Sequence, residues 1–162
     1  TFRGEFGEQL RTMLVFDALI YNEDRHFGNF GLLRNNHTGQ IIAPAPIFDN
    51  GLSLMAFAGK DDLDSFSHFE AYAKMRTNPY QVSYEDICHA VIGPVQKAQL
   101  RRMIGFQFHR HPAGTVTDTH LDYLEKLLEG RVQELLSIPS GDGKKAAGNG
   151  THDSQEPIFW RT

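Results

Sequence analysis

Apolar positions in the first part of the chain recur at helical spacing and then stop. Residues 8–22 predict a helix that is apolar nearly all round toward its end, which is typical of a buried helix. Asp17 lies within this apolar stretch, and two interpretations of it are open. In the first, the Asp17 carboxylate steadies the loop that follows. In the second, Asp17 is simply a partly exposed helix residue. Residues 22–29 are polar and glycine-containing, so they predict a loop directly after the helix.

Two short apolar runs follow this loop and predict a β-hairpin. They cover residues 30–34 and 40–43, and the five residues between them, 35–39, are rich in turn formers. Two prolines then end the second strand or place it at a sheet edge. Residues 48–51, Phe-Asp-Asn-Gly, come next, and Gly51 allows a turn with positive φ. The hairpin would carry the chain out from the first loop and bring it back beside that loop.

Beyond residue 52 the pattern becomes helical. Residues 83–86 resemble a capping box that opens a short helix through Val91. Pro94 lies where a further helix, over residues 95–109, would start. These segments predict a helical second half with no further sheet.

The clearest helix is predicted over residues 118–137, with a cap at Thr119-x-x-Asp122. After it the composition changes to Gly, Ser, Lys, Asp, Asn and Ala. This change predicts a folded domain over residues 1–138 and a disordered tail over residues 139–162 that ends in a small apolar island. The helix has one apolar stripe, made of Leu121, Leu124, Leu128, Val132 and Leu135.

Composition narrows the class of protein. The 162 residues suffice for one domain with a real core, and the formal charge of -4 does not favour direct nucleic-acid binding or an anionic membrane surface. No apolar run reaches the roughly 18–20 residues that span a bilayer, so no membrane partner is expected. The single cysteine, Cys88, excludes an intrachain disulfide, which fits a cytoplasmic protein, and its apolar surroundings predict a core residue.

The candidate chemistry lies in the two loops on either side of the hairpin. Asp24 would take the proton from an attacking hydroxyl, while Asn29, five positions on, and Asp49 would hold the magnesium ion that neutralises ATP phosphates. Arg25 and His26 would hold the loop or the phosphates. We therefore treat Asp24, Arg25 and His26 as candidate catalytic residues, and Asn29 and Asp49 as candidate ligands of magnesium and of the nucleotide.

Asp-Arg-His and Asp-Asn-Gly are also ordinary turn sequences, because Asp, Asn and Gly favour turns for local reasons. Either motif alone would be a coincidence more often than not. The joint pattern is more specific, since it combines a buried helix, Asp-x-x-x-x-Asn, a hairpin and an apolar-Asp-x-Gly in that order. It predicts a phosphoryl-transfer site at the base of the hairpin.

Residues 17–31, followed by residues 45–51, resemble the C-terminal lobe of bacterial HipA-like serine/threonine kinases, several of which are toxins of toxin–antitoxin pairs. They are also similar to phosphatidylinositol kinases, which carry an Asp-Arg-His catalytic loop. The resemblance implies a mainly α fold with a small β-hairpin, a protein-kinase-like C-lobe. It also implies that Asp24 is the catalytic base, that Asn29 and Asp49 bind magnesium, and that ATP is the phosphoryl donor.

Two departures from the family pattern stand out. The HipA toxin has a lysine immediately before the metal-binding asparagine, where this chain has Gly28. In addition, at most 23 residues precede Asp24, so the glycine-rich loop and lysine of an N-terminal lobe would be supplied elsewhere. The implied partners are a protein substrate, that lobe or a partner chain, and an antitoxin-like protein. Two other functions stay open: a non-catalytic, kinase-derived binding module and a magnesium-dependent phosphohydrolase.

Overall fold

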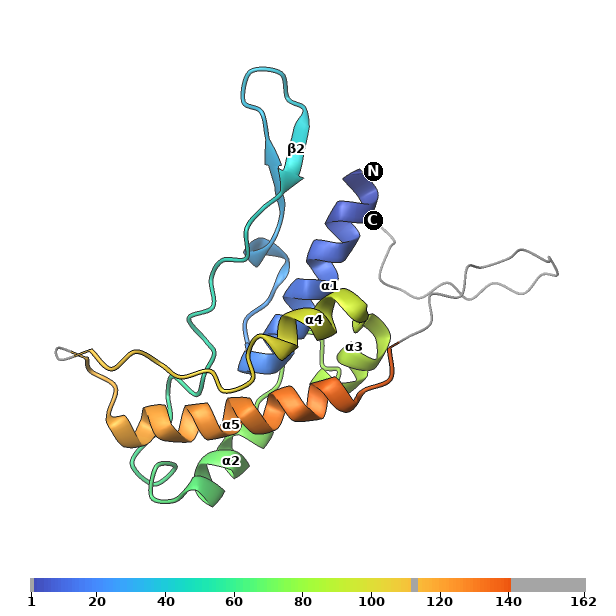
Figure 1. Ribbon diagram of the computed structural model, residues 1–162. Coiled ribbons are helices and arrows are strands. Elements are labelled where there is room, and N and C mark those ends of the chain that lie inside the picture. Colours follow the sequence, from blue (N-terminus) through green and yellow to red (C-terminus); the bar gives the residue numbers. More distant parts are fainter. Residues whose placement is uncertain (1, 112–113, 141–162) are drawn as a thin grey trace.

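The computed structural model describes residues 2–111 and 114–140, and most of the predicted tail lies outside these ranges. The described chain is mainly helical with one two-stranded antiparallel sheet, which confirms the coarse prediction of fold class (Figure 1). None of its helices is long and apolar enough to cross a membrane. In chain order the elements are α1 (Phe2–Ile20), the 3-10 helix η1 (Phe27–Asn29), β1 (Leu32–Arg34), β2 (Ile41–Pro44), α2 (Phe66–Lys74), α3 (Tyr84–Val91), α4 (Pro94–Arg101) and α5 (Asp118–Ser137).

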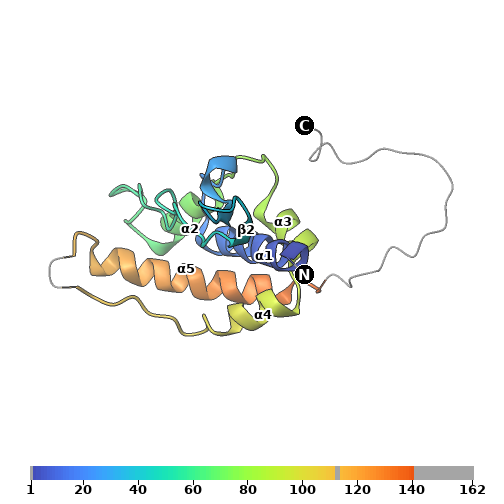
Figure 2. The ribbon, with the colours of Figure 1, turned by 90° about the horizontal axis from the view of Figure 1, so that it is seen from above.

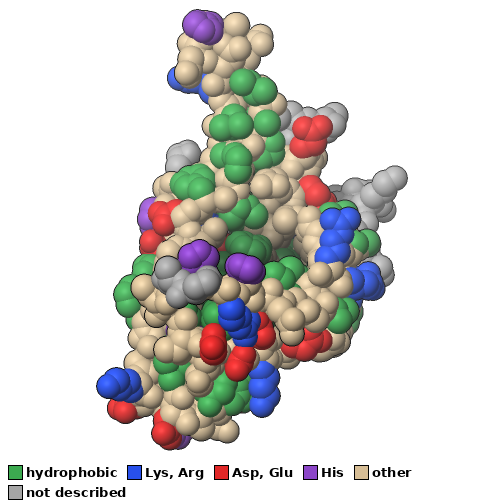
Figure 3. Space-filling view, turned by 60° about the vertical axis from the view of Figure 1, so that its left-hand side comes forward, with side chains coloured by type: hydrophobic (Ala, Val, Ile, Leu, Met, Phe, Trp, Pro, Cys, Tyr) green, Lys and Arg blue, Asp and Glu red, His purple; other side chains and the backbone are tan. Residues whose placement is uncertain are grey.

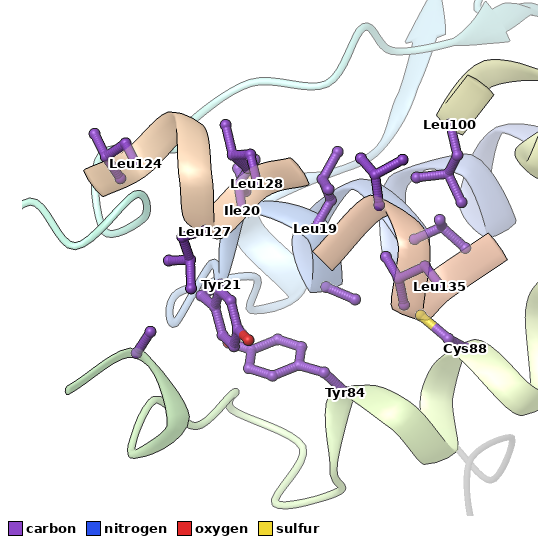
Figure 4. Packing of buried hydrophobic residues seen from close by; sticks show 14 of the residues in the cluster. Leu19, Ile20, Tyr21, Tyr84, Cys88, Leu100, Leu124, Leu127, Leu128 and Leu135 are labelled. Carbon is purple, nitrogen blue, oxygen red and sulfur yellow. The ribbon is translucent and has the colours of Figure 1, made fainter. Parts of the chain in front are cut away.

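The core lies between α1, α3 and α5. The last turns of α1 are buried on all sides, as the sequence predicts, and the long helix α5 runs past them with α4 beside it (Figures 1 and 2). Figure 4 shows side chains of α5 meeting those of α1, with Tyr84 and Cys88 of α3 closing the cluster. The predicted stripe on α5 faces this core: Leu124, Leu128, Val132 and Leu135 are buried and Leu121 is partly buried.

The hairpin projects from this helical body. Leu32 pairs with Pro44 and Leu33 with Ala43, and the ladder has an irregularity between Leu33 and Arg34. At the base the Ala45 N–H donates to the Gly31 carbonyl at 2.9 Å. Four large apolar side chains on the strands are between 40% and 60% exposed, and Figure 3 shows hydrophobic side chains along this projection. They are Leu32, Leu33, Ile41 and Ile42.

Several predicted bounds differ from the structure. Helix α1 begins at Phe2 and ends at Ile20 instead of covering residues 8–22, and α4 stops at Arg101 although apolar residues continue beyond it. The cap of α5 is Thr117, whose hydroxyl accepts from the His120 N–H, in place of Thr119. The predicted cap Ser83 is confirmed, because its hydroxyl accepts from the Asp86 N–H. A threonine caps a helix only when its own backbone is extended, and side-chain spacing does not reveal which of two nearby threonines that is.

Cys88 offers a simple probe of the core. Its side chain is fully buried, as predicted, and burial raises the pKa of the thiol to about 12. Because the thiolate is the reactive form, we expect iodoacetamide to leave Cys88 unmodified at pH 8 in the native protein and to label it fully in denaturant. Mass spectrometry after timed quenching measures this. Rapid labelling of the native chain would contradict the packing of α3 against α1.

Candidate functional site

Arg25 lies at the centre of the candidate site and is fully buried. Its Nε lies 2.9 Å from Asp17 Oδ2 on α1. Its Nη1 donates to the Asn29 carbonyl at 2.7 Å and to the Phe48 carbonyl at 2.6 Å, and its Nη2 donates to Asn50 Oδ1 at 2.5 Å. One side chain therefore joins α1 to both candidate loops, which we name the first loop (residues 21–31) and the second loop (residues 45–53).

Asp17 on α1 is the carboxylate that pairs with Arg25, and it is 4% exposed. Besides the ion pair with Arg25, its Oδ1 accepts from Asn22 Nδ2 at 2.9 Å. Burial raises the pKa of Asp17 above its ordinary value, and the hydrogen bonds from Arg25 and Asn22 act in the opposite direction. Of the two interpretations of Asp17, the structure supports the one in which its carboxylate steadies the following loop, and a partly exposed residue is excluded.

Asp24 and Asn29 are joined across the first loop. Asn29 is 4% exposed, and its Nδ2 donates to the Asp24 carbonyl at 2.8 Å. The Asp24 N–H in turn donates to Asn22 Oδ1 at 3.1 Å. In the described part of the chain, neither the carboxylate of Asp24 nor the Oδ1 of Asn29 accepts a hydrogen bond. The two hydrogen bonds fix the backbone of the first loop, and they leave the Asp24 carboxylate and Asn29 Oδ1 available to a ligand.

His26 is exposed beside Asp24 and caps η1. Its Nδ1 accepts from the Gly28 N–H at 3.0 Å, and its Nε2 lies 4.0 Å from Asp24 Oδ1. A neutral imidazole that accepts at Nδ1 carries its proton on Nε2, the side facing Asp24. A Cβ added at Gly28 would lie 2.9 Å from His26 Cε1, so a lysine there would force the ring to move. The glycine at position 28, where the HipA toxin has lysine, therefore allows the His26 ring to occupy its observed position.

Asp49 has the left-handed backbone of the second loop, with φ of 55°. Aspartate tolerates this region better than most residues with a side chain. The prediction that Gly51 supplies the positive φ is wrong, because the turn is made two residues earlier. Arg25 binds the residues on both sides, Phe48 and Asn50, whereas the Asp49 side chain is exposed and accepts no hydrogen bond from the described residues.

Two tyrosines far along the chain support the first loop, Tyr80 in the turn before α3 and Tyr84 at the start of α3, and neither belongs to a predicted motif loop. The Tyr80 hydroxyl donates to the Arg25 carbonyl at 2.5 Å, and the Tyr84 hydroxyl donates to the Asn22 carbonyl at 2.8 Å. Figure 4 shows Tyr84 against Tyr21, whose ring centroid lies 5.6 Å away in an edge-to-face arrangement. These contacts join residues 55 and 62 positions apart, and no local pattern signals them.

The five predicted site residues therefore divide into two groups. Asp24, Asn29 and Asp49 lie on loops that Arg25 holds together, and no described residue donates a hydrogen bond to their carboxylate or amide oxygens. Arg25 itself is buried, so of its two predicted roles its contacts support holding the loop. His26 is exposed next to Asp24. No cluster of three or more His, Cys, Asp or Glu arranged to hold a metal exists among the described residues.

Comparisons of this chain with protein-family models, with curated proteins and with solved structures find no match. The site is therefore interpreted from its own geometry and from the motif resemblance alone. In that geometry the loops that carry Asp24, Asn29 and Asp49 lie beside the end of a buried helix, to which Arg25 joins them.

Replacing Tyr80 with phenylalanine tests the support of the first loop. The change removes the hydroxyl group that donates to the Arg25 carbonyl. Because this carbonyl then lacks that donor, we expect the free energy of unfolding to fall by about 1–2 kcal/mol. Tyr123→Phe is the matched control, because the Tyr123 hydroxyl makes no hydrogen bond among the described residues. Urea titration of both variants measures the difference. Equal midpoints would show that the Tyr80 hydroxyl does not support the loop.

Proposed function

We propose that this chain is the C-terminal lobe of a HipA-like kinase that transfers the γ-phosphoryl group of ATP to a serine or threonine hydroxyl of a protein. The observation that carries the proposal is the contact of Arg25 Nη1 with both the Asn29 and the Phe48 carbonyls, which holds the two motif loops side by side. Two unrelated turns would not need a buried arginine between them. The order and spacing of the motifs add independent support.

The residues present fit a magnesium ion. Magnesium takes hard oxygen ligands and is commonly held by one or two carboxylates together with phosphates and waters. Asp49 offers an exposed carboxylate and Asn29 an amide oxygen, and neither group is used by another described residue. When bound, the ion would neutralise charge on the phosphates. One carboxylate and one amide fit an ion whose remaining ligands come from nucleotide and water.

Asp24 is the proposed base. Its carboxylate is 39% exposed and accepts no hydrogen bond from the described residues, so an acceptor hydroxyl can approach it. Its backbone is held on both sides, by Asn22 and by Asn29, which fixes where the carboxylate sits. His26 Nε2, 4.0 Å away, adds a donor that can orient the same carboxylate or a bound phosphate. Positioning of this kind supplies much of the rate in phosphoryl transfer.

The resemblance assigns the clamp on the ATP phosphates to an N-terminal lobe, and the surface supports a covering partner of that kind. A two-stranded hairpin is marginal on its own in water. Here both faces of the hairpin carry exposed Leu or Ile side chains (Figure 3), and Phe27 and Phe48 on the two motif loops are exposed as well. We therefore propose that transfer requires that lobe or an equivalent partner chain.

The proposal is tested with ATP and magnesium on this chain alone and on the full-length gene product. We expect nucleotide binding and transfer to a serine- or threonine-containing protein in the full-length product, and loss of transfer in Asp24→Ala and Asp49→Ala. Release of phosphate with no acceptor present would instead favour the phosphohydrolase. Absence of nucleotide binding in both proteins would refute the kinase and leave the non-catalytic binding module.

A further inference from the structure

A small apolar pocket lies between α1, α4 and the second loop. The two helices supply most of its lining, and Ile47 supplies the side of the second loop. Three of its apolar residues are buried in the core and three are partly buried. The described lining includes none of the proposed catalytic or magnesium-binding residues. We name it the α1–α4 groove and define it by these six apolar residues, which are Val15, Phe16, Leu19, Ile47, Leu100 and Met103.

The size of the groove decides what kind of group it can hold. Its volume is about 200 Å³. Small-molecule sites usually have volumes of about 300–1,000 Å³, so the groove is too small for most cofactors and substrates. A single aromatic or aliphatic side chain inserted into a pocket is, in contrast, a common anchor of protein recognition. The groove therefore fits an apolar side chain of a peptide segment.

One edge of the groove is polar and leads to an acidic residue. Gln96 and Thr12 both line the groove, and Gln96 Nε2 donates to Thr12 Oγ1 at 3.2 Å. The same Nε2 donates to Glu8 Oε1 at 2.5 Å, which places the Glu8 carboxylate beside this edge. Glu8 forms no ion pair with any described residue. The lining therefore suits a bulky apolar side chain with a cation next to it, the first for the groove and the second for Glu8.

The chain carries such a sequence outside the described residues. Residues 157–161 read Pro-Ile-Phe-Trp-Arg. The segment before them, residues 141–156, contains no Phe, Trp, Tyr, Leu, Ile, Val or Met. Phe159 and Trp160 offer large rings for the groove, and Arg161 offers the cation for Glu8. A tryptophan also carries one polar N–H on its apolar ring, which suits a groove with one polar edge.

The length of the chain allows this segment to reach the groove. The described chain ends at Ser140, three residues after α5, and Figure 2 shows α4 beside the last turns of α5. The 16 residues of segment 141–156 extend to at most roughly 55 Å. This exceeds the length of α5, about 30 Å for its 20 residues. Chain length therefore does not prevent docking between α1 and α4.

We propose that residues 157–161 dock in the α1–α4 groove of the same molecule, with the Trp160 ring in the groove and Arg161 beside Glu8. A second copy of the chain offers the same side chains, but the tether holds a molecule's own segment at a high effective concentration. Because Ile47 lies two residues before Asp49, docking would also restrain the second loop. The proposal does not depend on the proposed kinase activity.

Fluorescence of Trp160 tests the proposal without a label, because it is the only tryptophan among the 162 residues. In the full chain we expect its emission to be blue-shifted, and its quenching by acrylamide to be several-fold weaker, relative to the chain in denaturant. Met103→Gln and Ile47→Gln each place a polar amide in the groove, and each should move the emission toward that of the denatured chain. Met75→Gln is the matched control, since Met75 is 63% exposed outside the groove, and it should leave the emission unchanged.

Glu8→Gln tests the charged contact separately. It keeps an oxygen for Gln96 and loses the charge, so its emission should lie between those of the wild type and the groove variants. Circular dichroism verifies that each variant is folded. The proposal is overturned if Trp160 is quenched as strongly in the native chain as in denaturant, or if neither groove variant shifts its emission. A blue shift that disappears on dilution would show docking on a second copy, and this result would also overturn it.

Discussion

Replacing Arg25 with alanine should lower the free energy of unfolding by about 3–5 kcal/mol, the usual consequence of removing one partner of a buried ion pair. The loss is large because Asp17 would keep a buried charge with only Asn22 as partner. Two carbonyls and the Asn50 side chain would also lose their donor. Urea unfolding followed by circular dichroism measures the change, and both loops should lose their amide protection in hydrogen exchange.

Two controls give this prediction its specificity. Arg34→Ala removes an exposed arginine from β1 that forms no ion pair among the described residues, and it should change stability by less than about 0.5 kcal/mol. Arg25→Lys keeps the charge but loses the planar fork, so it should fall between wild type and alanine. Near-native stability in Arg25→Ala would refute the role of Arg25 in joining the loops.

The pH dependence of Arg25→Ala provides a further signature. Burial already raises the pKa of Asp17, and the variant removes the hydrogen bond from Arg25 that opposes this effect. A carboxyl group whose folded pKa exceeds its unfolded pKa stabilises the fold below the unfolded value, and this stability is lost as the pH rises through the folded pKa. The deficit of Arg25→Ala relative to wild type should therefore shrink as the pH falls from 7 toward 4. A deficit that grows on acidification would contradict the buried pair.

Asp24→Asn should reduce phosphoryl transfer by about 10²–10⁴-fold in the full-length gene product, the usual contribution of a positioned general base. The fold should be little affected, because no described residue donates a hydrogen bond to the Asp24 carboxylate and its backbone contacts remain. Initial rates at saturating ATP and magnesium, together with melting temperatures, measure both effects. Loss of transfer with unchanged melting temperature separates chemistry from folding.

Asp61→Asn is the matched control for this second prediction, since Asp61 is an exposed aspartate outside both motif loops. Its transfer rate should equal that of the wild type. Asp49→Asn should differ from Asp24→Asn in one respect: raising the magnesium concentration should restore part of its activity, because it weakens a proposed ligand and leaves the base intact. Wild-type rates in Asp24→Asn would remove Asp24 from the chemistry.

The sequence predicted what depends on local chemistry. The hairpin followed from turn-forming residues between two apolar runs, and α5 followed from the spacing of its leucines. The two motif loops were predicted because Asp, Asn and Gly break helical patterns visibly. Their joining through Arg25 is only partly predictable, since the sequence allows Arg25 to hold either the loop or the phosphates.

The remaining features depend on tertiary contacts. Tyr80, in the turn before α3, and Tyr84, at the start of α3, support the first loop from far along the chain, and a lone tyrosine carries no sequence signal of that role. Asp49, and not the nearby glycine, took the left-handed conformation because Arg25 fixes the residues on both sides of it.

Paramagnetic NMR with manganese in place of magnesium tests most directly whether the two loops hold a metal–nucleotide complex. With ATP and substoichiometric Mn²⁺ added to the full-length product, the account predicts selective broadening of the amide signals of Asn29 and Asp49. Asp49→Asn should abolish this broadening, and Asp61→Asn should preserve it. Broadening that bypasses both loops, or that persists unchanged in Asp49→Asn, would contradict the account.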